Sequence, residues 1–411
     1  MVRILTADTA LVDVPLKHEN YQSVIASFNW PPGSEKNQIS ESQMHDIIAA
    51  IGEQEHVAWD EGAPWYDRVR TLLENEKIDA FAGGSAINAL STLTRSYPPS
   101  ERPQVDVITA VGCGPFGHIA RASCDKAGLT LIPPMTQEEQ QQVRTARSFI
   151  FNGGDSRQIA SYSGNVKDMV EHTHAAQIDT HLDNNRYDMI FIPGSLVSKM
   201  PKSFDRLVAK SRADHSELYL SLPTSESMLN ANYDKIYDSM KTASCILGNE
   251  QELGYLIKRM QKEGHLDPLA PSIDTTPTDA LLHWMSTQDD AKTAFISKGK
   301  EGACVISANE KIDLPIWDNN VKIVSQTGAG DASFGGFLTG MMMGYTPEKS
   351  AHLAMAYASA CVAQHESQLH DPLATLQAAQ TQTDAAGRPI IGEPSGTAIA
   401  QSIPFQQLRR A

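Results

Sequence analysis

The chain has 411 residues, of which 41% are hydrophobic, and a formal net charge of −15 at pH 7. This length and apolar content predict a large buried core, arranged as one large domain with a lobe or as two domains. The acidic balance argues against nucleic acid as a partner, because positive charge dominates that kind of binding. A phosphate site in this chain must therefore be made locally, from backbone N–H groups, a few basic residues and Mg²⁺.

The five cysteines are odd in number, and no pair has the spacing of a metal site. We interpret them as reduced, mostly buried thiols of a cytoplasmic protein. Residues 1–14 contain no basic segment followed by a long apolar run, so they predict a first strand rather than a signal peptide. No later segment is long and apolar enough to span a membrane, and we expect no membrane partner.

Apolar residues at 4–14 predict a buried strand that carries Asp13 near its end. Residues 15–79 are less regular, with helix patterns at 40–51 and 66–76. This segment is too long for a simple connection in a compact sheet, and we expect part of it to form a separate lid.

Two segments in the middle of the chain stand out. Residues 81–90 place the glycines Gly83 and Gly84 before a helix, and Asn88 projects from the first turn of that helix, near the glycines. Residues 145–162 have two extended halves around Asn-Gly-Gly-Asp, which predicts a β-hairpin and again suggests a lid.

Strands and helices alternate along most of the chain. This alternation predicts an α/β fold with a mostly parallel sheet covered by helices on both faces, together with a small β lid. Ligands of such sheets bind beyond the carboxyl ends of the strands. The segment from residue 371 onward is rich in Gln, Thr, Ala, Gly and Pro, and we expect it to be mobile or loosely packed. The strands expected after the hairpin are 187–193, 218–222, 245–248, 293–297 and 304–307.

The segment at 321–340 carries the strongest chemical signal. We expect a strand at 321–324, a tight turn at Gly328, Ala329 and Gly330, and a helix that begins near Asp331. Glycine angles let consecutive N–H groups point at one spot, and the helix adds its N-terminal positive charge there. Asp331 would be repelled by a phosphate that it had to bind, so we interpret it as the base that takes a proton from an attacking hydroxyl.

Taken together, the motifs resemble the ribokinase-like, or PfkB, carbohydrate kinases. Four segments occur in that family's order: AFAGGSAINAL at 80–90, LGNEQE at 247–252, ISKGKEG at 296–302 and VSQTGAGDASFGGFL at 324–338. Further likenesses favour adenosine-kinase-type members, although fructokinase-like and ribokinase-like members remain open. The resemblance implies a kinase domain over residues 1–370, with a lid from parts of about 15–80 and 134–168 and a tail at 371–411.

The resemblance also implies roles for individual residues. The activity would be transfer of the γ-phosphoryl group of Mg·ATP to a primary hydroxyl of an adenosine-like nucleoside or a sugar, in a monomer or homodimer. The implied site residues are Asp331 as general base, Gly328, Ala329 and Gly330 as anion hole, Asp13, Gly83, Gly84 and Asn88 around the acceptor, Ser297, Gly299, Gly302 and Tyr357 around the nucleotide, and Asn249 and Glu252 near Mg²⁺, through water.

Simpler interpretations and departures from the family stand beside these roles. Asn249 and Glu252 also fit a helix cap and a first-turn acid. The histidines at 172, 174 and 181 fit a solvated surface better than a metal site. Ser325-Gln326 stands where the family has Asp-Thr, Gly114-Pro115 where an aspartate is common, and Tyr357 where a small or amide side chain is usual. These departures keep a second alternative open, a catalytically weak ligand-binding member of the fold.

Overall fold

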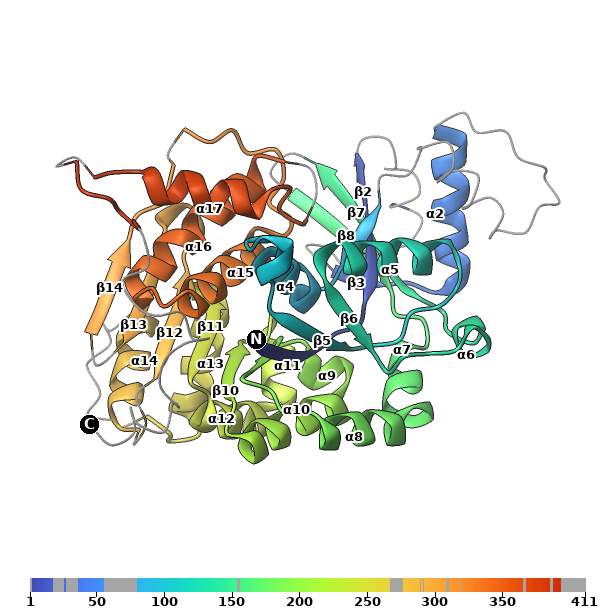
Figure 1. Ribbon diagram of the computed structural model, residues 1–411, viewed down its shortest axis with the longest axis horizontal. Coiled ribbons are helices and arrows are strands. Elements are labelled where there is room, and N and C mark those ends of the chain that lie inside the picture. Colours follow the sequence, from blue (N-terminus) through green and yellow to red (C-terminus); the bar gives the residue numbers. More distant parts are fainter. Residues whose placement is uncertain are drawn as a thin grey trace.

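In the part of the chain that the structure describes, nine strands form the central sheet of this computed structural model (Figure 1). The order across the sheet is β14-β13-β12-β11-β10-β9-β1-β5-β6, and the pairs from β12 to β6 are parallel. The strands are β1 (Arg3–Ala7), β5 (Gln104–Ile108), β6 (Leu129–Ile132), β9 (Met189–Ile192), β10 (Glu217–Ser221), β11 (Cys245–Asn249), β12 (Thr293–Ser297), β13 (Ala303–Ser307) and β14 (Glu310–Leu314).

The described residues are 2–17, 26, 36–54, 80–153, 156–266, 276–288, 290, 292–307, 310–318, 320–364, 367–384 and 387–392. The helix expected at 66–76 lies outside them. None of the helices in this part of the chain combines the length and apolar character that crossing a bilayer requires.

Helices cover both faces of the central sheet, as the alternating strand residues require. Ile4 and Tyr219 point into a core shared with the first group of helices, whereas Leu5 and Leu220 point into a separate core shared with the second group. The first group is α4 (Ser85–Arg95), α5 (Pro115–Ala127), α15 (Ala329–Met342) and α16 (Pro347–Val362). The second is α8 (Ala175–Asn184), α10 (Pro201–Asp214), α12 (Tyr233–Thr242), α13 (Glu250–Lys262) and α14 (Pro277–Ser286). Shorter helices are α6 (Gln137–Gln141), α7 (Val166–Asp168), α9 (Leu196–Lys199) and α11 (Glu226–Ala231), with a π-helical turn at Met169–Thr173 and 3₁₀ turns at Pro99–Glu101 and Gly299–Glu301.

A second, five-stranded sheet has the order β3-β8-β7-β2-β4. Its β7–β8 hairpin is antiparallel, which confirms the predicted hairpin. Buried side chains of α2, among them Met44 and Ile47, pack against this sheet and join its core to the main core. Figure 1 shows β2, β7, β8 and α2 together at the end of the molecule away from β14. The elements are β2 (Leu11–Lys17), β3 (Lys36–Gln38), β4 (Phe81–Gly83), β7 (Ala146–Gly153), β8 (Ser156–Tyr162) and α2 (Glu41–Gln54).

Three sequence-based expectations about these elements are wrong. The single strand expected at 4–14 is divided into β1 and β2, because residues 8–10 carry the chain from the central sheet to the five-stranded one, and Asp13 lies within β2. Residues 321–324 form no strand; Ile323 is 60% exposed, and the N–H of Val324 bonds to the carbonyl of Val362 rather than to a strand. The segment after residue 371 is not uniformly loose, because α17 (Pro372–Thr381) packs on α16 and buries Leu376 and Ala379. The polar composition hid these apolar residues, which are three positions apart on one helix face.

Candidate functional site

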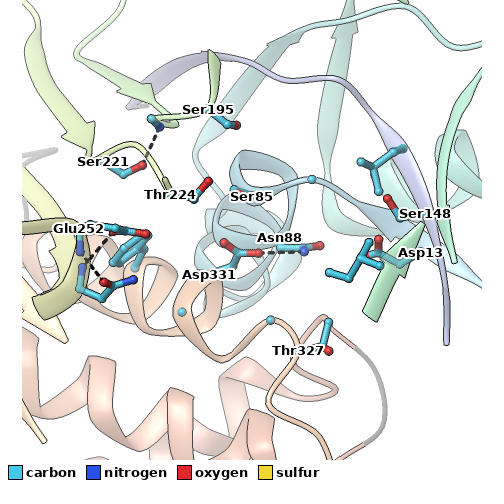
Figure 2. A pocket seen from close by; sticks show the side chains of 18 of the residues that line it. Asp13, Ser85, Asn88, Ser148, Ser195, Ser221, Thr224, Glu252, Thr327 and Asp331 are labelled. Atoms are coloured by element: carbon cyan, nitrogen blue, oxygen red, sulfur yellow. Dashed lines mark hydrogen bonds between the residues drawn. The ribbon is translucent and has the colours of Figure 1, made fainter. Parts of the chain in front are cut away.

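A polar pocket of about 270 Å³ lies between the two sheets, beyond the carboxyl ends of β9 to β12 (Figure 2). Its walls come from distant parts of the chain, as expected for an open α/β sheet. From the five-stranded sheet come Asp13, Ser148, Ile150, Ile159 and Ser161; from the loops and helices of the central sheet come Gly84, Asn88, Gly194, Ser195, Lys199, Ser221, Thr224, Asn249, Glu252, Ser297, Thr327, Gly328, Gly330, Asp331 and Phe334.

The floor of the pocket is the turn that opens α15. Gly328 has a φ of 81°, in the left-handed region, and it caps the helix. A Cβ atom at this position would lie 1.9 Å from the carbonyl oxygen of Ser367, so both the angle and the space require glycine. Gly328 and Gly330 line the pocket, Ala329 lies between them as the first residue of α15, and Asp331 follows in the first turn. The helix N-terminus and an acid are thus brought to the same place.

A chain of hydrogen bonds joins the acids of the pocket. The Asn88 amide donates to Oδ2 of Asp331 at 3.1 Å and lies 3.5 Å from Oγ of Ser367. Ser367 in turn donates to Oδ2 of Asp13 at 2.8 Å. Figure 2 shows Asn88 and Asp331 pointing toward each other, with Asp13 on the same side as Ser148. Asp13, Asn88 and Asp331 are therefore brought together from β2, α4 and α15.

The glycine pair at 83–84 has a physical explanation in this arrangement. A Cβ on Gly83 would lie 2.3 Å from the Asp13 carboxylate, and one on Gly84 would lie 2.6 Å from the Asp8 carboxylate. Gly84 also has a φ of 111° and lines the pocket. Gly83 does not line the pocket, but its lack of a side chain leaves space for the Asp13 carboxylate. Asp8 accepts hydrogen bonds from the N–H groups of Ala86 and Ile87, which open α4.

Burial controls the charge of the Asp13 and Asp8 carboxyl groups. Burial raises the pKa of Asp13 to about 7; the hydrogen bond from Ser367 opposes this rise, whereas the nearby Asp331 adds to it. The pKa of Asp8 is also raised, mainly by burial, and Lys199 and the α4 N–H groups oppose the rise. The part of the pocket around Asp13 therefore carries less negative charge at neutral pH than its residue types suggest.

Asn249 and Glu252 form a reciprocal helix cap at the start of α13. The Asn249 side chain accepts from the Glu252 N–H at 2.9 Å, and Glu252 Oε2 accepts from the Asn249 N–H at 3.0 Å. Both residues also line the pocket. The described residues contain no group of three or more His, Cys, Asp or Glu that could hold a metal ion. The Glu252 carboxylate and the Asn249 amide nevertheless fit Mg²⁺, which is commonly held by one or two carboxylates together with waters and phosphates.

The residues predicted to bind the nucleotide are not all in one place. Ser297, at the end of β12, lines the polar pocket. Gly299 and Gly302 lie in the following turn with φ values of 57° and 94°, and neither lines the pocket. Tyr357 corrects our expectation: its side chain is fully buried and its hydroxyl bonds to Ser96 at 2.7 Å, so no ring face is open to a base. It occupies the inner face of α16, packed with Leu353 and Cys361.

A second hollow, of about 910 Å³ and more open, adjoins the outer face of α16. Its wall includes Ala356 and Ala360 of α16, Trp317 and Val321 of the segment before α15, and residues of α17. Tyr357 follows Ala356 in the sequence and therefore points about 100° away around the helix, into the core rather than into this hollow.

Several residues in or beside the pocket were not predicted from the sequence. Ser367, in the segment after α16, bonds to Asp13 of the pocket, and Lys199, which lines the pocket, ends the short helix α9. Ser195, Ser221 and Thr224 follow the carboxyl ends of β9 and β10, which was the one available signal for them. Small hydroxyl side chains are common in ordinary loops, so their position after a strand was weak evidence on its own.

The departures from the family pattern have structural roles. Ser325 is buried and its hydroxyl accepts from the Thr327 N–H at 3.2 Å, so it stabilises the approach to the glycine turn. Gly114 caps α5, and Pro115 is that helix's first residue.

The expectation that the histidines at 172, 174 and 181 lie on a solvated surface is wrong for His174, which is buried with Nδ1 2.7 Å from Gln177 Oε1.

Comparison with known proteins agrees with this fold. The family model for pfkB family carbohydrate kinases matches residues 48–398. A probable sugar kinase from Rhizobium etli CFN 42 has a similar solved structure, with a TM-score of 0.66, 17% identity, and coverage of 92% of this chain and 98% of that one. Adenosine kinase from Sinorhizobium meliloti gives a TM-score of 0.66, 17% identity, and coverage of 92% and 99%.

A curated relative is more similar over a shorter stretch. An ATP-dependent 6-phosphofructokinase from Thermoanaerobacterium thermosaccharolyticum is 39% identical over 81 residues, which are 20% of this chain and 24% of that protein. The alignment therefore spans about a quarter of the curated relative's length. Since the family model matches most of the sequence and the fold agrees with it, the chain belongs to the pfkB family of carbohydrate kinases.

Proposed function

We propose that this protein is an ATP-dependent kinase that phosphorylates a primary hydroxyl of a small polyhydroxylated acceptor, with Asp331 as general base. The observation that carries the proposal is the position of Asp331. It lies in the first turn of α15, directly after the Gly328–Gly330 turn, in the same pocket as Asp13 and Asn88.

In the proposed reaction, the acceptor hydroxyl loses its proton to Asp331 as its oxygen forms a bond to the γ-phosphorus. The bond from that phosphorus to the β,γ-bridging oxygen breaks, and ADP leaves with the electron pair. The N–H groups at the start of α15 stabilise negative charge on the transferring group. The bond from Asn88 fixes the Asp331 carboxylate toward the acceptor side of the pocket.

We assign the ring hydroxyls of the acceptor to Asp13 and Asn88, and Mg²⁺ to the neighbourhood of Asn249 and Glu252. When bound, Mg²⁺ neutralises charge on the nucleotide phosphates. The adenine base of ATP would extend past Ser297 toward the open hollow between Trp317 and α16, which has the room and the apolar wall that a base requires.

A sugar is the acceptor that the pocket wall favours. Hydroxyl side chains dominate the described wall, which contains Ser85, Ser148, Ser161, Ser195, Ser221 and Thr224, and Phe334 is its aromatic residue. An adenosine-like nucleoside is the second candidate, supported by the fold shared with adenosine kinases. Mass spectrometry of products from a mixed pool of sugars and nucleosides with Mg·ATP would separate the two.

Replacing Asp331 with asparagine tests the catalytic assignment. We expect kcat to fall by ~10²–10⁴, because the general base is lost while shape and nucleotide binding remain. Steady-state kinetics and nucleotide titration would measure both effects. The matched control is Asp183→Asn, an exposed aspartate on α8, which should leave kcat unchanged. Turnover of Asp331→Asn within a few fold of the unmodified enzyme would refute the assignment.

A further inference from the structure

Lys199 is the basic residue among the described residues that line the polar pocket, where it lies with the carboxylates of Asp13, Glu252 and Asp331. It ends α9, directly after the carboxyl end of β9, and its side chain is exposed. A cation in such a position either neutralises the neighbouring acids or binds an anionic ligand.

The neighbouring acids already have other partners. Asp13 accepts from Ser367, Asp331 accepts from Asn88, and Glu252 takes part in the cap of α13. Within the part of the chain that the structure describes, no ion pair or side-chain hydrogen bond involves the Lys199 ammonium group. The positive charge of Lys199 is therefore not neutralised by a salt bridge to any of these three carboxylates.

The charge of Lys199 acts on the acceptor side of the pocket. It lowers the pKa values of both Asp8 and Asp13, so it lies near these two carboxyl groups. Burial nevertheless raises the pKa of Asp13 to about 7, so this acid cancels only part of the lysine charge at neutral pH, and burial also raises the pKa of Asp8. Hydroxyl groups of Ser195, Ser221 and Thr224 lie on one side of the pocket and can donate further hydrogen bonds (Figure 2).

We propose that the acceptor carries an anionic group, and that Lys199 is the specificity-determining residue that binds it. This inference rests on the proposed kinase function and names the substrate class: a polyhydroxylated molecule with a primary hydroxyl for Asp331 and a negative group at its other end. A phosphate ester and a carboxylate share this chemistry, and both would accept charge-assisted hydrogen bonds from an ammonium group.

Matched acceptors test the proposal in the full-length chain with Mg·ATP. Fructose 6-phosphate and gluconate each have an anionic group and a free primary hydroxyl, and fructose and adenosine are neutral. We expect kcat/KM for an anionic acceptor to exceed that for the neutral ones by about 10- to 100-fold, the range for a hydrogen bond to a charged group. The two anionic acceptors distinguish a phosphate ester from a carboxylate.

The variant Lys199→Met should remove this preference. Its kcat/KM for the anionic acceptor should fall by about 10- to 100-fold, while values for the neutral acceptors and the KM for ATP stay unchanged. Lys199→Arg should retain most of the preference. The control is Lys202→Met, three residues along the same segment, where the ammonium lies beside His172 and outside the pocket.

Two results would overturn the inference while leaving the proposed function intact. The first is a higher kcat/KM for a neutral acceptor than for either anionic one. The second is a kcat/KM of Lys199→Met for anionic acceptors that equals that of the unmodified enzyme. A rise in the KM for ATP in Lys199→Met would also overturn it, because the lysine would then serve the nucleotide. Failure of the proposed function would look different, since no acceptor would be phosphorylated in an Asp331-dependent way. In that case calorimetric titration with fructose 6-phosphate and gluconate still decides, because absent or Lys199-independent binding of both contradicts the inference.

Discussion

At the scale of single residues, the pocket depends on how burial changes the charge of its acids. Asp13 has a pKa of about 7, close to physiological pH, because burial disfavours its ionised form more than Ser367 restores it. An ionised carboxylate accepts hydrogen bonds from ring hydroxyls more strongly than a protonated one does. Acceptor affinity should therefore depend on pH in a range where few side chains titrate.

We predict that KM for a neutral acceptor such as fructose falls as pH rises through about 7, because the fraction of ionised Asp13 increases. Initial rates between pH 5.5 and 8.5 at saturating Mg·ATP would measure this. Asp13→Asn should raise KM and remove its pH dependence. Ser367→Ala should move the transition to higher pH, since the hydroxyl that stabilises the ionised form is lost. An acceptor KM that is flat across this range would contradict the assignment of Asp13.

The same raised pKa has a consequence for stability, with the opposite dependence on pH. The folded state binds the proton of the Asp13 carboxyl group more tightly than the unfolded chain does, because aspartates of the unfolded chain titrate near pH 4. The contribution of Asp13 to the free energy of unfolding is therefore greatest below about pH 4 and decreases as pH rises to about 7. Acceptor binding and stability are thus in conflict at Asp13, as is common at functional sites.

At the scale of secondary-structure elements, the sequence predicted what periodicity and glycine patterns determine. The β7–β8 hairpin and the glycine turn before α15 form as expected. In the turn before α15, Gly328 has a positive φ, which glycine adopts without strain. The expected strand at 321–324 does not form, since its apolar residues find no neighbouring strand. Strand propensity depends on such partners, which a single sequence does not reveal.

The site shows the same division between local and long-range information. Asp331 and Asn88 carry strong local signals, because each lies at a glycine turn. Asp13 lies within β2, and its assignment came from the family resemblance. Ser367 and Lys199 carry no local signal, because their importance comes from contacts with residues far away in the chain. Tyr357, which the resemblance placed near the nucleotide, is fully buried in the core, because its position in the sequence does not tell which way its side chain points.

The turn that opens α15 leads to a prediction about backbone geometry. Gly328→Ala should lower the free energy of unfolding by at least ~1–3 kcal/mol, because alanine is strained at this positive φ and its Cβ would meet the Ser367 carbonyl. Thermal denaturation would measure the change. Gly330→Ala is the matched control: its Cβ would meet nothing within 4 Å, so stability should be unchanged or slightly higher. Equal melting temperatures for the two variants would contradict this account.

At the scale of the whole molecule, the pocket exists only where the two sheets meet. Asp13, Ser148 and Ser161 come from the five-stranded sheet, whereas the glycine turn and Asp331 come from a helix packed on the central sheet. A bound acceptor would contact both, so it should hold the two sheets together. Separation of the sheets would then require release of the acceptor, and binding would oppose it.

Hydrogen exchange measures this coupling between binding and sheet separation. With acceptor and a non-hydrolysable ATP analogue at ten times their dissociation constants, amides in β2, β7 and β8 that exchange through such opening should slow by about tenfold. Helix α8 lines neither the polar pocket nor the hollow beside α16, and it serves as an internal control with no change expected. The analogue alone should protect the start of α15 but not the five-stranded sheet. If the acceptor protected only α15 and left β7 and β8 unchanged, the five-stranded sheet would have no part in acceptor binding, and the roles given to Asp13 and the hydroxyls around it would have to be withdrawn.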